Sequence, residues 1–275
     1  MSDSHPPESW PPGMKIVNGH LARSLRDQGM LKTPNDYGYL HLAAEIERPH
    51  PLKKNSAQKT ALLGELKRLA EALAVAESAG VRRADVFDAF VIPPGARAGR
   101  KVIEKAGYDV HVAAFDVAVL VECHSPEAAL EVRQSDAFGA IRSLLEKNAT
   151  CVHAIAARNA KRIDEVDKTR NGVFLFNYFF AANAAEGTGD GDGIVLAVWE
   201  YTAGWFTACA NLTNSTLLEP LPGERSEYAV INHCRWDRKI DVFPHLVFRP
   251  SIRRFVLANF TANGIVAMPI LYHLA

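Results

Sequence analysis

Residues 115–132 read FDVAVLVECHSPEAALEV, and this stretch decides the fold class. Every second residue from Phe115 to Val121 is apolar, which is the period of a β-strand with one face against a core. Ser125 and Pro126 follow, an N-cap residue and a proline at the first helical position. The stretch therefore predicts a strand that leads directly into a helix.

The residues on either side extend this pattern to a complete unit. Apolar and mixed residues alternate from Tyr37 to Ile46, and leucines recur at helical spacing after a capping box formed by Asn55 and Gln58. The predicted elements are a strand at 37–46, a helix at 55–80, strands at 84–92 and 115–123, a helix at 125–147 and a strand at 151–158. Their order is β-α-β-β-α-β, which is the order of a ferredoxin-like unit.

The same order recurs in the second half of the chain. The predicted strands are 173–181, 215–221, 228–236 and 267–274, with an aromatic helix around 199–206 and an interrupted helix over 241–263. AVLVECH (118–124) can be aligned with AVINHCR (229–235), which keeps Ala, Val and Cys in register and places Glu122 on His233. We therefore expect an α+β fold of two tandem units, 36–160 and 171–275, after an N-terminal tail of residues 1–35.

Composition excludes several classes of protein. Of the 275 residues, 48% are hydrophobic and 23% are charged, so the chain can bury a core. Lys plus Arg and Asp plus Glu number 31 each, and this balance argues against a nucleic-acid or acidic-membrane partner. No long apolar run or signal-peptide pattern is present, so we expect a cytoplasmic protein. The four cysteines lack C-x-x-C spacing, which argues against a zinc ribbon or a disulfide framework.

With these features the chain resembles the dimeric α/β-barrel superfamily, of the antibiotic-biosynthesis-monooxygenase type. The resemblance covers residues 37–158 and 172–275, and its most family-like part is the strand ending at Cys123 with the SPEAAL (125–130) and SDAF (135–138) steps that follow. It implies that two ferredoxin-like sheets pair into one barrel with the helices outside. A tandem copy would build this barrel from one chain, as a monomeric pseudo-dimer or within a homodimer.

The resemblance implies several activities. The superfamily includes haem-degrading and cofactor-independent monooxygenases, polyketide cyclases, haem-dependent decarboxylases and stress-response proteins, and the fold alone does not choose among them. In haem-binding relatives the axial histidine follows the S-D-x-F step, where this chain has Arg142, and the matching place in the second half falls near Phe255. Neither is a haem ligand. We therefore expect no cofactor and no metal, with His245 as an imperfect substitute ligand if haem binds.

The second half offers the preferred site, a cleft between its first helix and its sheet. Aromatic walls with a few polar anchors are typical of small-molecule sites. Ordinary core packing of the tryptophans is the alternative. The predicted catalytic residues are His233, Asn232, Arg235 and Asn177, and the predicted substrate-binding residues are Trp199, Trp205, Phe206, Tyr178 and Trp236.

A second polar locus is predicted in the first half. The first and third strands of a ferredoxin-like sheet are neighbours, so we expect their ionisable residues to lie together. These residues are His41, Glu45, Glu122 and His124. They could form a hydrogen-bonded seam with arginines such as Arg235, act as acid and base, or bind a metal.

The resulting hypothesis is a cofactor-independent monooxygenase, cyclase or isomerase that acts on an apolar or aromatic small molecule, with His233 as its base. The alternative is a non-catalytic small-molecule-binding or stress-response barrel. The basic insertion at 96–112 is interpreted as a solvated face, although it could meet an anionic ligand. The glycine-rich stretch Gly187 to Gly193 is interpreted as a flexible connection, because it lacks the lysine of a phosphate-binding loop.

Overall fold

The computed structural model describes residues 10–23, 28, 30–49, 54–93, 103–104, 107–182, 191–242 and 249–275. The strands of the first half are β1 (Gly38–Glu45), β2 (Val81–Val91), β3 (Val117–Cys123) and β4 (Cys151–Arg162). Those of the second half are β5 (Val173–Ala181), β6 (Thr216–Pro220), β7 (Val230–Trp236) and β8 (Ile265–Leu274).

These strands close into a barrel in the order β1-β3-β2-β8-β5-β7-β6-β4. Each half contributes a four-stranded antiparallel sheet with its first and third strands at the centre, which is the ferredoxin-like arrangement. The two sheets join where β2 pairs with β8 and β4 pairs with β6. The predicted fold of two tandem units forming an intrachain α/β barrel is therefore confirmed.

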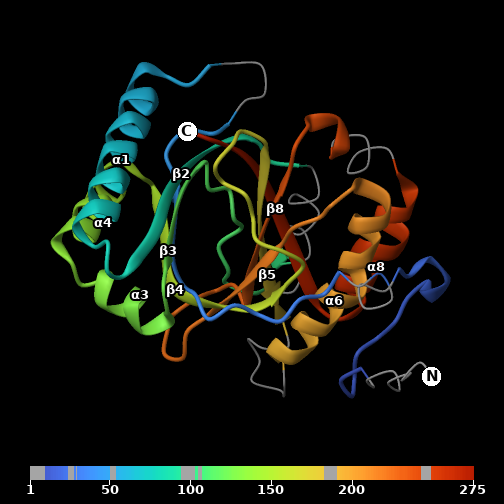
Figure 1. The fold of residues 1–275 in the computed structure, drawn as a ribbon. Helices are drawn as coiled ribbons and strands as arrows, with labels where there is room; N and C mark the ends of the chain where they lie inside the picture. Colours follow the sequence, from blue (N-terminus) through green and yellow to red (C-terminus); the bar gives the residue numbers. More distant parts are fainter. Residues whose placement is uncertain are drawn as a thin grey trace.

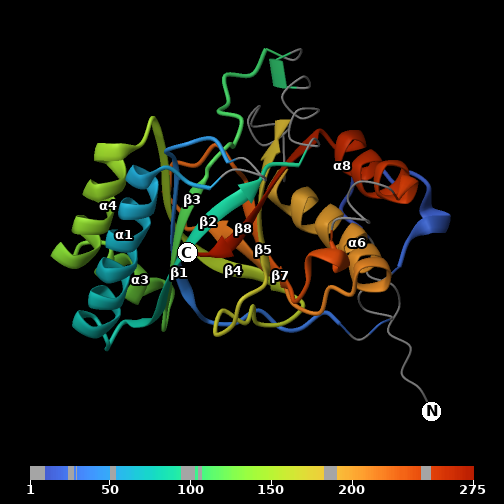
Figure 2. The same cartoon turned by 90° about the horizontal axis from the view of Figure 1, so that it is seen from above.

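Helices cover the outside of the barrel on two opposite sides (Figures 1 and 2). The first half supplies α1 (Ala57–Ala76), α3 (Pro126–Val132) and α4 (Asp136–Asn148). The second supplies α6 (Gly191–Ala210), the π-helix η3 (Ile252–Leu257) and α8 (Ala258–Ala262). Two short 3-10 turns, η1 (Gly19–Leu21) and η2 (Lys239–Asp241), complete the described elements.

Serine caps set the helix boundaries in the first half. The Oγ atoms of Ser125 and Ser135 accept backbone hydrogen bonds three residues on, so the single helix predicted for 125–147 is in fact two helices, α3 and α4. The predicted capping box at Asn55 is wrong by one residue. Ser56 is the N-cap of α1, and its Oγ accepts from the amide of Lys59, 3.1 Å away.

The inside of the barrel is a packed core. Side chains that alternate along each strand point inward, where rings such as Phe87, Phe176 and Tyr272 are fully buried. Phe115, which precedes β3, and Val166, from the linker between the halves, join the same core. The opposite face of each sheet packs on its own helices. Any small-molecule site is therefore more easily built between a sheet and its helices than inside the barrel.

The described residues of the predicted tail contact both halves. Met14 and Leu21 pack against the core beneath α6 and α8 of the second half, and Lys32 forms an isolated antiparallel β-bridge with Arg162 of β4 in the first half. No helix among the described residues is long and apolar enough to cross a membrane. Several predicted features lie outside the described residues: the basic side chains Arg97, Arg100, Lys101 and Lys105, the glycine-rich stretch before residue 191, and His245.

Candidate functional site

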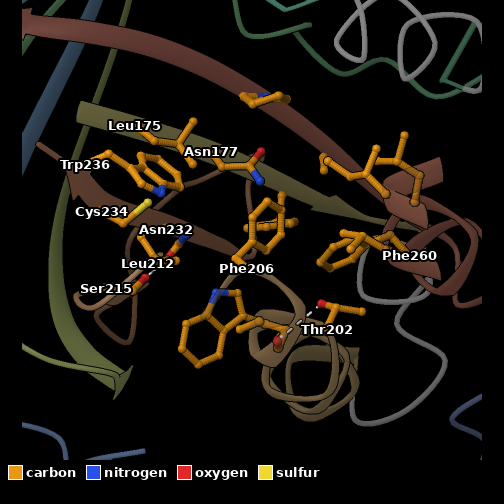
Figure 3. A pocket seen from close by; sticks show the side chains of 18 residues that line it. Leu175, Asn177, Thr202, Phe206, Leu212, Ser215, Asn232, Cys234, Trp236 and Phe260 are labelled. Atoms are coloured by element: carbon orange, nitrogen blue, oxygen red, sulfur yellow. Dashed lines mark hydrogen bonds between the residues drawn. The ribbon is translucent and has the colours of Figure 1, made fainter. Parts of the chain in front are cut away.

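A cavity of about 80 Å³ lies between the second-half helices and the outer face of their sheet (Figure 3). α6 and η3 form one wall, and β5, β7 and β8 form the other. Its lining comprises Leu175, Asn177, Phe179, Trp199, Thr202, Ala203, Phe206, Leu212, Ser215, Asn232, Cys234, Trp236, Ile252, Val256, Leu257, Phe260, Ala267 and Pro269. The cavity is thus mostly apolar, with aromatic rings on both walls.

Two amide side chains on the sheet are the main polar groups of this cavity. Asn177 on β5 and Asn232 on β7 are paired directly across the two strands and share the outer face. Ser215 donates a hydrogen bond from its Oγ to the Oδ1 of Asn232 at 2.6 Å, which fixes the orientation of that amide. The Oδ1 of Asn177 is buried and accepts no hydrogen bond from any described residue. A buried acceptor without a donor is costly, and a donor at this point would remove that cost.

The cavity has little acid–base chemistry of its own. Cys234 is the sole ionisable side chain among the described residues that line it. Burial raises the pKa of the Cys234 thiol well above its usual value, so the thiol stays protonated at neutral pH. These lining residues can bind and orient a molecule through hydrogen bonds, but they supply no general base.

His233 lies on the other side of the sheet. Neighbouring residues of a strand point to opposite faces, so Asn232 faces the cavity and His233 faces the barrel interior. Its ring stacks on Phe176 at a centroid distance of 4.2 Å, and Nδ1 donates to the carbonyl of Leu175 at 3.2 Å. Burial holds the pKa of His233 well below 6.5, so the imidazole is neutral. The predicted placement of His233 in the helix–sheet cleft is wrong for this reason of strand parity.

Two other predicted members of the cleft, Arg235 and Tyr178, are also on the inner face. The guanidinium of Arg235 is buried at the end of the barrel, where it pairs with Asp237 at 2.7 Å. The hydroxyl oxygen of Tyr178 lies 3.4 Å from Nε2 of His41 inside the barrel. Trp205 is buried beside Phe206 but does not line the cavity. The cavity therefore brings together the predicted residues Asn177, Asn232, Trp199, Phe206 and Trp236 and excludes the others.

The predicted polar locus of the first half does not assemble. β1 and β3 are antiparallel, and Tyr39 pairs with Glu122, so the residues after Tyr39 diverge from the residues after Glu122. Glu45 lies at the far end and contacts Nε2 of His111 at 2.7 Å, whereas His124 is exposed beyond the end of β3. Glu122 pairs instead with Lys168 and His41 contacts Tyr178, so the four predicted residues do not form one cluster. Within the described residues, no group of His, Cys, Asp and Glu is placed to hold a metal ion.

The barrel itself is shared with other solved structures. An anthrone oxidase-like protein matches with a TM-score of 0.56 at 13% sequence identity, over 87% of this chain and 91% of that one. This chain has the dimeric α/β-barrel fold. A structure described as "Putative monooxygenase" from Fusobacterium nucleatum subsp. nucleatum matches with a TM-score of 0.52 at 6% identity, over 87% of this chain and 93% of that one. No family model and no curated protein matches the sequence.

The described residues that line the helix–sheet cavity do not fit a haem. They include no histidine, and Cys234 is a protonated thiol on the sheet. None of the cavity's described residues carries a basic side chain that could neutralise propionate groups. An engineered cavity that accommodates benzene measures about 150 Å³, and a cavity of about 80 Å³ is far too small for a macrocycle.

Several lining residues were not predicted from the sequence. Ser215 and Thr202 are single hydroxyls within apolar elements, and the η3 wall depends on the tertiary position of Ile252 and Val256. Pro269 gave a usable signal, because proline is rare within a strand. Pro269 pairs with Asn177 in the β5–β8 register, so the proline of β8 lies beside the unpaired Oδ1 of Asn177.

Proposed function

We propose that this protein binds a small, uncharged, largely aromatic molecule that carries a hydroxyl group, in the helix–sheet cavity of its second half. Apolar walls provide most of the binding energy in such sites, and a few placed polar groups provide orientation. Here the Oδ1 of Asn177 accepts a hydrogen bond from the ligand's hydroxyl group, and the amide of Asn232, held by Ser215, lies directly across from it. A charged ligand is disfavoured because no charged side chain faces the cavity among its described residues.

The observation that carries this proposal is a comparison between the two copies of the unit. His233 pairs with Phe176 and Glu122 pairs with Tyr39, so the equivalents of Asn177 and Asn232 in the first half are Leu40 and Val121. Leu40 and Val121 pair across their strands and are fully buried under α1, α3 and α4. The fold is therefore built equally well with apolar residues at this point.

The amide pair is thus not required by the fold. It adds two polar groups to a core position and leaves one acceptor unpaired, which lowers stability by about 1–3 kcal/mol. Departures from the folding rules of this kind are typical of functional sites. A ligand that donates to Asn177 would remove this cost.

Catalysis is a second candidate, and the amide of Asn232 is the feature that favours it. A fixed side-chain amide can donate to an oxygen that gains negative charge, as in an oxyanion hole. The fold neighbours described above include proteins named as an anthrone oxidase-like protein and a monooxygenase. An oxygenase, cyclase or isomerase at this site would have to use the acidity of the substrate itself, because the described lining contains no base. This activity stays a prediction.

The test is a binding comparison between 2-naphthol and naphthalene, which differ by one hydroxyl. Wild-type protein and the double variant Asn177→Leu/Asn232→Val, which copies the first half, are titrated with each probe while tryptophan fluorescence is followed. We expect wild type to bind 2-naphthol about tenfold more tightly than naphthalene, as one hydrogen bond to a buried group allows. The double variant should bind the two probes equally well.

A matched control keeps this experiment specific. His233→Phe changes the residue next to Asn232 on the inner face and should leave both affinities unchanged. The proposal fails if neither probe binds wild type, or if the preference for 2-naphthol persists in the double variant. Oxygen uptake measured with 2-naphthol present would test the catalytic candidate separately.

A further inference from the structure

Asn259 of α8 and Asn263, the C-cap residue of that helix, hold the backbone of the N-terminal segment. The Oδ1 of Asn263 accepts from the amide of Lys15 at 2.7 Å, and its Nδ2 donates to the carbonyl of Lys15 at 2.8 Å. Asn259 repeats this with Val17, at 2.9 Å for both bonds. The two asparagines are four residues apart, so they lie on one face of α8 and match alternate residues of an extended chain.

These asparagines are also held by the backbone of their own helix. Asn259 is fully buried and Asn263 is 6% exposed. Nδ2 of Asn259 also donates to the carbonyl of Phe255, and Nδ2 of Asn263 also donates to the carbonyl of Asn259, each at 2.8 Å. The Oδ1 and the second Nδ2 hydrogen of each asparagine therefore bind the peptide backbone of the segment, whatever side chains it carries. Together they form a built receptor for an extended segment.

The segment connects both helices that cover the cavity. Besides α8 it contacts α6, because the ring of Trp10 packs edge-on against Tyr201 at 5.5 Å. The side chain of Asn18 donates to the carbonyl of Arg254, which lies in η3, at 2.6 Å. Figure 2 shows the segment running along the outer side of α8. Residues 10–18 thus tie α6, η3 and α8 to one another.

The cavity wall that this segment contacts includes the π-helix η3. η3 is a π-helix, a wider and less common form that is frequent at functional sites. Ile252, Val256 and Leu257 of η3 line the cavity, and η3 continues directly into α8. The cavity, at about 80 Å³, is about half the volume that accommodates benzene, so a ring-sized ligand must displace a wall.

We propose that residues 14–18 are a latch that keeps the η3–α8 wall closed, and that release of Lys15 and Val17 from Asn263 and Asn259 opens the cavity to its ligand. This inference rests on the proposed function for the identity of the cavity's ligand, but not for the latch itself. Four hydrogen bonds hold the backbone of Lys15 and Val17 to this wall, so their loss changes the opening equilibrium directly.

The test compares two proline substitutions in the full-length protein. Val17→Pro removes the amide that donates to Asn259, whereas Ile16→Pro alters the adjacent residue, whose side chain is 49% exposed and whose backbone is not held by either asparagine. Hydrogen exchange of residues 252–263 reports wall opening, and stopped-flow mixing with 2-naphthol reports entry. Loss of one hydrogen bond predicts exchange and association about threefold to tenfold faster in Val17→Pro than in Ile16→Pro.

The two readouts separate failure of the latch from failure of the proposed function. Equal exchange of residues 252–263 in the two proline variants overturns the latch, whatever binds. Faster exchange in Val17→Pro supports the latch even if 2-naphthol binds no form of the protein, a result that counts against the proposed function alone. If Val17→Pro does not fold, Asn259→Ala takes its place, and the expected increase is at least as large because Asn259 makes both hydrogen bonds to Val17.

Discussion

Replacement of His233 by phenylalanine distinguishes a structural histidine from a catalytic one. The imidazole lies among phenylalanine rings, with Phe176 at 4.2 Å, Phe87 at 5.5 Å and Phe174 at 6.0 Å between centroids. Its Nε2 is buried and has no hydrogen-bond partner among the described residues. A phenyl ring keeps the stacking and removes this unpaired nitrogen. We therefore expect His233→Phe to fold. Its larger ring should lower the stability at pH 7.5 by about 1–3 kcal/mol.

The magnitude of interest is the change in stability with pH. Burial lowers the pKa of His41 to about 3 and that of His153 to about 4, and it holds the pKa of His233 well below 6.5. Below pH 6.5 the unfolded chain takes up protons that the folded chain refuses, so stability falls as the pH falls. At pH 5.0, which is 1.5 units lower, His41 and His153 each account for a loss of about 2 kcal/mol, which together is about 4 kcal/mol. His233 adds a loss in the same direction, with about 2 kcal/mol as its upper limit because the unfolded pKa sets that limit.

Urea unfolding at pH 7.5 and pH 5.0 measures this difference for wild type and for His233→Phe. The variant lacks one of the three histidines, so its loss of stability between the two pH values should be smaller, by up to about 2 kcal/mol. Effects of ring size are present at both pH values and cancel in this difference. Binding of 2-naphthol at pH 7.5 should be unchanged.

Two results would refute this reasoning. Equal acid sensitivity in the two proteins would mean that His233 titrates normally in the folded state and is open to water. Loss of 2-naphthol binding or of any discovered activity in a folded His233→Phe protein would return His233 to the site, and the assignment of the outer cavity would then be wrong.

Three further substitutions test the polar groups that support the fold. Lys59→Met removes the partner of the buried Asp116 carboxylate, 2.7 Å away, and should cost about 3–5 kcal/mol in urea unfolding; a cost below about 1 kcal/mol would contradict a buried ion pair. Glu122→Gln takes the carboxylate from Lys168, 2.6 Å away, and should cost about 1–3 kcal/mol by the same measurement, with 2-naphthol binding intact; weakened binding would place Glu122 at the site. Ser56→Ala removes the N-cap of α1 and should lower stability by about 1 kcal/mol, and an unchanged unfolding midpoint would argue against this cap.

The fold could be predicted because its information is local. Period-two and helical patterns identified nearly every strand and helix of both halves, and the repeated element order indicated the duplication. The errors are at boundaries, where one residue decides. Ser56 rather than Asn55 caps α1, and Ser135 starts a new helix within a continuous helical pattern.

The site could be predicted only in part, because a strand presents its residues to two faces. Asn232 and His233 are adjacent in the sequence and were assigned to one cleft, but the sheet separates them. The error at His41 and Glu122 has a different cause. Their strands were correctly taken as neighbours, but the pairing of Tyr39 with Glu122 is a register that no local pattern specifies.

The repeat did identify a real relation inside the barrel. Glu122 and His233 occupy equivalent positions on β3 and β7, and Lys168 acts on both. It pairs with Glu122, and together with burial, which is the larger cause, it lowers the pKa of His233. Lys168 belongs to the linker between the halves, at the end of the barrel. A barrel of two identical chains would place the same residue at both positions and would have no linker to supply a lysine. Fusion of the halves therefore permits the asymmetry seen here, with an ion pair in one copy and a neutral histidine in the other.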